Sequence, residues 1–118
     1  MKNIFLGLVI FALLSGCDGM FGIDNVQRHV SPDGRYEAVV FRGGAGATTR
    51  FSFHLTILKT NGKLKNSPGN TYVSYSEFEV EWKDDNTLYV DNRDAKSIFK
   101  QEKNVGGIQL EYAVYKKE

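Results

Sequence analysis

Apolar and polar residues alternate one by one through most of the chain beyond residue 34, and this period of two constrains the fold more than any other feature. The alternation runs through RYEAVVFR, FSFHLTIL, EFEVEW and IQLEYAVY, which are residues 35–42, 51–58, 77–82 and 108–115. Successive side chains of a β-strand point to opposite faces, so such a segment buries one face and exposes the other. The pattern predicts half-buried antiparallel strands.

Turn sequences separate these strands at short intervals. SPDG places proline at the second turn position, and TNGK carries an Asn-Gly pair that suits a tight hairpin. The other turn sequences are SPGN, KDDN and NVGG, at 67–70, 83–86 and 104–107. Asp94 could cap a short helix over 94–104, but the adjacent Ile98 and Phe99 build no helical stripe, so we expect a strand there.

These patterns predict an all-β fold and a single small domain. We expect an antiparallel meander of about six or seven strands. The sequence leaves open whether they form an open sheet, a sandwich or a partial barrel. The predicted β-domain covers residues 31–118, and residues 17–30, which are small or polar with little periodicity, are predicted to be a tether.

The amino-terminal segment has the form of a signal peptide. Lys2 is followed by eleven uncharged residues, from Ile4 to Leu14. A helix needs about 20 apolar residues to cross a bilayer, so this run is too short to span one. It has the length of the apolar region that follows a positive start in a secretory signal peptide. We therefore predict a signal peptide at residues 1–16.

Leu14-Ser15-Gly16-Cys17 resembles the lipobox of bacterial lipoproteins. The resemblance implies that the Cys17 thiol carries a diacylglycerol, that the bond before it is cut, and that the new amino terminus is acylated. Two or three acyl chains attach a protein stably, whereas one holds only marginally. An ordinary signal peptide followed by a buried free cysteine is the alternative.

Asp18 resembles the residue that keeps lipoproteins in the inner membrane of enteric bacteria. The resemblance implies a protein anchored to the inner membrane and facing the periplasm or the exterior. An ordinary tether residue is the other interpretation of Asp18.

The charge balance excludes some partners. The chain has 15 basic and 14 acidic residues, and residues 1–16 contain Lys2 and no acid, which leaves 14 of each. A neutral mature chain argues against nucleic acid as a partner, and against a polybasic hold on anionic lipid. With its single cysteine acylated, the chain forms no disulfide, so the apolar core alone must stabilise the fold.

Two further segments resemble a family of small uncharacterised bacterial proteins that are often membrane-anchored. They are SPDGRYEAVVFR and GATTRFSFHLTILK, at residues 31–42 and 46–59, and the acidic strand with Trp82 follows them. The resemblance covers roughly residues 31–115. It implies a single β-domain, and it implies no activity and no functional residue.

The segment RGGAGATTR is the candidate binding loop. Its backbone N–H groups and two guanidinium groups could together hold an anion. The residues concerned are Arg42, Gly43, Gly44, Gly46, Thr48, Thr49 and Arg50. A phosphate-binding loop of the Walker type would need a lysine and a following helix, and the sequence has neither at this place. A flexible hairpin loop without ligand is the alternative.

Two other groups of residues are weaker candidates for chemistry. Ser52 and His54 lie on one strand face, close enough to touch, but no orienting acid or oxyanion hole is evident. His29 lies in the predicted tether, so the two histidines show no metal spacing. Glu77, Glu79 and Glu81 share a strand face that could gather a divalent cation, although such a row is typical of a solvated face. We predict no metal and no cofactor.

Three tyrosines fall opposite the main core residues of their strands. They are Tyr75, Tyr89 and Tyr115. On a sheet that buries one face only, they could form a contact patch. In a closed fold they would form a second small core.

These features together predict a lipoprotein tethered to a membrane. Its expected role is that of a non-catalytic binding or structural module of the cell envelope. The expected partners are membrane lipid, through the acylated Cys17, and another envelope protein. An inhibitor or immunity-type protein is one alternative, and a small hydrolase using Ser52 and His54 is another.

Overall fold

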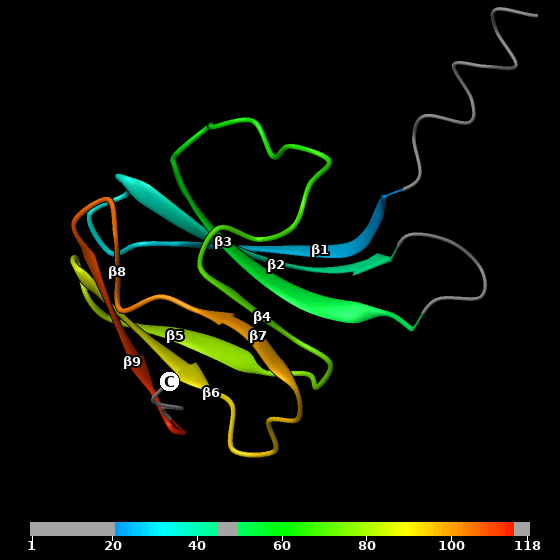
Figure 1. Cartoon of the computed structure of the whole chain (residues 1–118). Coiled ribbons are helices and arrows are strands. Elements are labelled where there is room, and N and C mark those ends of the chain that lie inside the picture. Colours follow the sequence, from blue (N-terminus) through cyan, green and yellow to red (C-terminus); the bar gives the residue numbers. More distant parts are fainter. Residues whose placement is uncertain (1–20, 45–49, 115–118) are drawn as a thin grey trace, which may run out of the picture.

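The computed structural model of the chain describes residues 21–44 and 50–114 (Figure 1). The predicted signal peptide, Cys17 and Asp18 lie outside the described residues, as do residues 45–49 of the candidate binding loop. In the described part, no helix has the length and apolar content needed to cross a membrane.

Nine strands make up the described residues, so the all-β fold in one small domain is confirmed. In chain order they are β1 (Gly22–Val30), β2 (Tyr36–Gly44), β3 (Ser52–Lys59), β4 (Tyr72–Ser74), β5 (Glu79–Asp84), β6 (Thr87–Asp91), β7 (Ile98–Gln101), β8 (Asn104–Val105) and β9 (Ile108–Tyr112). The predicted count of six or seven strands was too low, because β1 and the two-residue β8 give no alternating pattern of their own.

The strands form two sheets that share one core. The first sheet, called sheet A here, has the order β1-β2-β3-β4-β7, and sheet B has the order β5-β6-β9-β8. Buried side chains of both sheets pack together with Phe78, which precedes β5; they are Ala38, Leu55, Ile57 and Tyr72 from sheet A, and Leu88, Val90, Ile108 and Leu110 from sheet B. The arrangement is therefore a sandwich of two open sheets.

The predicted antiparallel meander is wrong in its connections. The chain passes from sheet A to sheet B after β4, returns to form β7, and passes back to form β8 and β9. Strands β6 and β9 consequently run parallel, with Leu88 opposite Leu110. Alternation reports which face of a strand is buried, but it carries no information about which strand lies beside it.

The predicted tether is also wrong over most of its length. Residues Gly22–Val30 form the edge strand β1, which pairs antiparallel with β2 from Gly22↔Gly44 to Val30↔Glu37. A register shift between Asp24 and Gln27 interrupts the pairing. Most side chains of β1 are exposed, so the strand lacks an alternating apolar pattern. Charged residues and an irregularity are typical of an edge strand, because they discourage pairing with other chains.

Strand β3 is buried on both faces, although its alternation predicts a half-buried strand. Leu55 and Ile57 face the shared core, while His54 and Thr56 are buried on the opposite face. Phe51, which was expected on the core face, precedes the strand and is exposed.

The loop at residues 60–71 covers this second face of β3. The Asn-Gly sequence does form a turn, with Asn61 at a φ of 68°. It does not join a hairpin, because the next strand begins at Tyr72. The loop instead returns along β3 (Figure 1): the Gly69 N–H donates to His54 Nδ1 over 3.0 Å, and the Asn70 side chain bonds both the N–H and the carbonyl of Ile57.

Three of the other turn predictions are confirmed, whereas SPGN lies within the loop at residues 60–71 and forms no turn of its own. SPDG joins β1 to β2, with the Gly34 N–H donating to the Ser31 carbonyl over 2.9 Å. KDDN joins β5 to β6, and the two glycines of NVGG, both at positive φ, join β8 to β9. Within residues 94–104 the structure has the strand β7, as expected.

We predict that Gly69→Ala destabilises the fold by roughly 1–3 kcal/mol, the usual cost of overpacking a core. A Cβ at Gly69 would lie 2.6 Å from the Leu55 carbonyl oxygen and 3.0 Å from the Leu55 nitrogen, and these backbone atoms have little freedom to move. The measurement is the free energy of unfolding in urea. Gly22→Ala is the control, because its Cβ would meet nothing closer than 3.9 Å. Equal effects of the two variants would contradict the tight contact.

Candidate functional site

The two arginines of the candidate binding loop have separate partners. Arg42 lies directly opposite Asp24 and pairs with it through Nε–Oδ1 and Nη2–Oδ2 contacts of 2.8 and 2.7 Å. The hydrogen bond from Arg42 is the main cause that lowers the pKa of Asp24. The Arg42 guanidinium also lies 4.2 Å from the centre of the Phe51 ring. The positive charge of Arg42 is therefore already paired with the carboxylate of Asp24.

Arg50 lies 3.9 Å above the Tyr75 ring, which in turn packs edge-on against Phe99 at 4.7 Å between ring centres. Among the residues that the structure describes, Arg50 forms no ion pair. Phe51 and Phe99 are 50% and 58% exposed. Of the predicted loop residues, Gly46, Thr48 and Thr49 lie outside the described residues. Arg50 thus lies against the Tyr75 ring, which packs on Phe99, while Phe51 contacts Arg42.

The two loop glycines at the end of β2 serve packing. Gly43 is buried, and a Cβ there would lie 2.5 Å from the Phe21 ring and 3.1 Å from His54 Nε2. A Cβ at Gly44 would lie 3.3 Å from the Phe51 ring. The missing side chain at Gly43 lets Phe21 and His54 approach the strand.

His54 lies at the centre of a buried aromatic cluster, with 2% of its surface exposed. Its ring stacks on Phe41 at 5.0 Å and meets the edge of Phe21 at 5.5 Å. Nδ1 accepts a hydrogen bond from the Gly69 N–H, and Nε2 lies 2.8 Å from Ser52 Oγ. Burial, and to a lesser degree the positive charge of Lys100, lower the pKa of His54 to about 4.

These contacts fix the tautomer of His54. A backbone N–H can only donate, so Nδ1 carries no proton and the neutral ring carries its proton on Nε2. Nε2 therefore donates to Ser52 Oγ, which donates in turn to the Gly43 carbonyl over 3.3 Å. A general base would have to accept the serine proton at Nε2 and would need an acid at Nδ1. The geometry argues against a hydrolase that uses Ser52 and His54.

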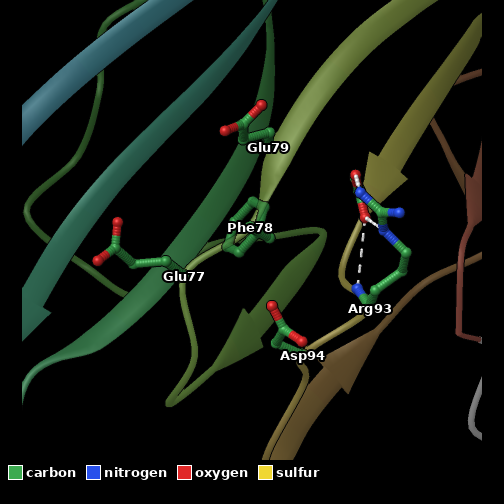
Figure 2. Close-up of a pocket in the computed structure, with 6 residues that line it drawn as sticks. Glu77, Phe78, Glu79, Arg93 and Asp94 are labelled. Atoms are coloured by element: carbon green, nitrogen blue, oxygen red, sulfur yellow. Dashed lines mark hydrogen bonds and ion pairs between the residues drawn. The ribbon is translucent and has the colours of Figure 1, made fainter.

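A pocket of about 560 Å³ lies at one mouth of the sandwich. Figure 2 shows its lining, which comes from the start of β5 and the segment before it, and from the end of β6 and the turn after it. The residues are Glu77, Phe78, Glu79, Asp91, Arg93 and Asp94. Arg93 pairs with Asp91 through two contacts of 2.9 Å, and among the described residues Glu77, Glu79 and Asp94 form no ion pair. Glu77 and Phe78 also line a second pocket of about 280 Å³ beside β1.

The predicted row of glutamates is only partly present. Glu79 and Glu81 point outward from β5, whereas Glu77 precedes the strand. Within residues 21–44 and 50–114, no group of three His, Cys, Asp or Glu side chains could hold a metal ion. Asp91, Arg93 and Asp94 were missed as lining residues; Asp91 lies opposite Glu79 in the β5–β6 hairpin, so the register of that hairpin is the signal that could have found it.

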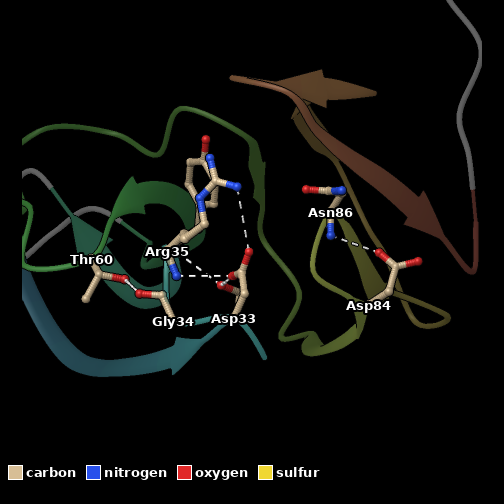
Figure 3. Close-up of polar contacts among 8 residues, drawn as sticks. Asp33, Gly34, Arg35, Thr60, Asp84 and Asn86 are labelled. Atoms are coloured by element: carbon tan, nitrogen blue, oxygen red, sulfur yellow. Dashed lines mark hydrogen bonds and ion pairs between the residues drawn. The ribbon is translucent and has the colours of Figure 1, made fainter.

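Other acidic residues stabilise turns. Asp33 accepts hydrogen bonds from the Ser31 hydroxyl and the Arg35 N–H, at 2.7 and 3.1 Å, and these bonds lower its pKa. Asp84 accepts a bond of 2.8 Å from the Asn86 N–H (Figure 3). Both carboxylates accept hydrogen bonds from residues of their own turns, as expected for aspartate in turns.

A family model covers most of the chain. The family model DUF5412, a family of unknown function, matches residues 2–103. The chain belongs to this family. No curated protein and no solved structure matches it. The part shared with DUF5412 includes β1 to β7, the Ser52–His54 pair and the acidic pocket, and ends before β8.

We predict that the DUF5412 fold loses stability as the pH falls from about 6.5 to about 4, the interval between the ordinary and the folded pKa of His54. In this interval the unfolded chain binds a proton that the folded chain does not, so the free energy of unfolding rises with pH. The full effect amounts to roughly 3 kcal/mol, at about 1.4 kcal/mol for each pH unit. Urea unfolding at several pH values measures it.

His54→Gln should remove this dependence, because the variant lacks the group that titrates. His29→Gln is the matched control and should keep it, since His29 lies in the edge strand with no part in the buried cluster. The aspartates with lowered pKa values lose their contribution only below their ordinary value of 3.8, outside this interval. An unchanged slope in His54→Gln would contradict the assignment.

Proposed function

We propose that this DUF5412 member is a bacterial lipoprotein, anchored to a membrane through an acylated Cys17 and facing the periplasm or the exterior. The observation that carries the proposal is the sequence Leu14-Ser15-Gly16-Cys17, directly after eleven uncharged residues. Asp18 favours the inner membrane. The first described strand begins at Gly22, five residues after Cys17, so an anchor at Cys17 would hold the domain at the start of β1.

We further propose that the anchored domain is a non-catalytic binding module for another component of the envelope. The tautomer of His54 supports a role without catalysis at Ser52. The mouth of the sandwich is the proposed contact site, because its two pockets meet at Glu77 and Phe78. A pocket is the default place for binding, and the charged side chains around Phe78 in this one favour a polar or charged group of the partner. An inhibitor or immunity-type protein would use the same site, and the identity of the partner would distinguish it.

Replacing the acylated residue tests the anchor. Cys17→Ser should abolish labelling by radioactive palmitate and release the protein from the membrane fraction, because serine offers no thiol for the diacylglycerol. Ser15→Ala is the control and should keep the label, since alanine preserves a small residue before the cleavage site. The same fractionation of the unchanged protein should find it in the inner membrane. Labelling of the Cys17→Ser variant would refute the anchor.

Crosslinking in intact cells tests the contact site. A photoreactive amino acid at position 79, on the acidic pocket, should give one discrete adduct with another protein. The same group at Lys65, exposed in the loop that covers β3, should give none. The difference is expected because only position 79 lies at the mouth of the sandwich. Adducts of equal yield from both positions, or no adduct from position 79, would contradict the site.

A further inference from the structure

We propose that the surface formed by Arg50, Phe51, Tyr75 and Phe99 docks on the lipid bilayer, with its rings at the boundary between headgroups and acyl chains. This group of four is called the aromatic surface below. The inference rests on the proposed anchor at Cys17, and it adds an orientation of the domain on the membrane that the anchor alone does not imply.

Contacts between rings and a guanidinium link three of the four side chains of the aromatic surface, and Phe51, the chain neighbour of Arg50, contacts the Arg42 guanidinium. Phe51 and Phe99 leave about half of their surface to solvent, at 50% and 58%. The Arg50 guanidinium lies on the Tyr75 ring, and the Tyr75 ring packs on Phe99. Large exposed aromatic side chains that lie together on a soluble domain mark an interaction site.

The position of this surface relative to the anchor carries the inference. Gly22 at the start of β1 pairs with Gly44 at the end of β2, and Gly43 pairs with Ser52 at the start of β3. The aromatic surface therefore lies at the end of sheet A where the described chain begins (Figure 1). Phe21 packs there against His54 and Gly43.

Cys17 is four residues before Phe21. A fully extended chain spans about 3.6 Å per residue, so this segment reaches at most roughly 14 Å. An acylated Cys17 lies at the membrane surface, and the end of sheet A must then lie within that distance of it. A flexible tether of fourteen residues, as the sequence suggested, would have left the orientation of the domain free.

The chemistry of the aromatic surface fits a bilayer. Tyrosine favours the interface between water and hydrocarbon because it combines an apolar ring with a polar hydroxyl, and phenylalanine adds apolar area that can be buried at the acyl boundary. The guanidinium of Arg50 has no acid partner in the described residues, and arginine pairs with phosphate oxygens through parallel hydrogen bonds. Glu77 lies only two residues from Tyr75, so net charge is not what attracts this surface. Burial of the rings is the main contribution.

Fluorescence quenching by brominated lipid tests the orientation. The acylated full-length protein is reconstituted into vesicles of phosphatidylethanolamine and phosphatidylglycerol, with part of the lipid brominated near the headgroup end of its acyl chains. Trp82→Phe removes the single tryptophan. Phe51→Trp and Phe99→Trp are then introduced separately, and each should lose emission in brominated vesicles compared with unbrominated ones.

Val30→Trp is the matched control. Val30 is 51% exposed, like the two phenylalanines, but it lies at the other end of β1. Eight residues of strand separate it from Gly22, which corresponds to about 26 Å. Its emission should be unchanged by bromine. If Trp82→Phe lowers the yield of folded protein, the same variants are measured with Trp82 present and the emission of the parent protein is subtracted.

The outcomes separate the two proposals. Protein that carries palmitate and floats with the vesicles, but shows no quenching at positions 51 and 99, would overturn the docking and leave the anchor intact. Equal quenching at position 30 would also overturn it, because the domain would then have no preferred orientation. Protein that neither carries palmitate nor floats would overturn the anchor, and the docking with it.

Discussion

The burial of β3 on both faces is the constraint on which the rest of the structure depends. One face packs in the core shared by the two sheets, and the other is closed by the loop at residues 60–71 and by Phe21. His54 is where these parts meet: its ring contacts Phe41 and Phe21, and its nitrogens bond Gly69 and Ser52. A buried polar ring is tolerated because both of its nitrogens have partners. The same contacts that make His54 structural deprive it of a free base.

The sequence predicts the strands well wherever one face is buried and the other is exposed to solvent. Strand β5 shows this, since Val80 and Trp82 pack against the core while Glu79 and Glu81 are exposed. The prediction fails for strands that are exposed on both faces or buried on both faces. An edge strand such as β1 is mostly exposed and therefore has no alternating pattern to detect, whereas β3 has the pattern but is buried on both faces.

The candidate site is harder to predict, for a related reason. Ser52 and His54 are two residues apart on one strand, so their contact follows from the period of two. The direction of their hydrogen bond depends on Gly69, fifteen residues further on, and no local pattern contains it. The acidic pocket likewise joins Glu77 to Asp94 at the open end of the β5–β6 hairpin, where the strand register places Glu79 opposite Asp91. The hydrogen-bond direction at His54 and the lining of the acidic pocket therefore depend on how the chain is connected and paired, and not on its composition.

The pairing of β1 with β2 changes what a lipid anchor would do. As a flexible tether, residues 17–30 would have held the domain near the membrane and let it turn freely. As a strand, β1 is fixed along sheet A, and Trp82 of sheet B donates a hydrogen bond of 2.8 Å to the His29 carbonyl near its far end. An anchor four residues before Phe21 would therefore act on a rigid body and not on a loose chain. One end of the sandwich would be held at the bilayer, and its orientation there would depend on the side chains that this end presents.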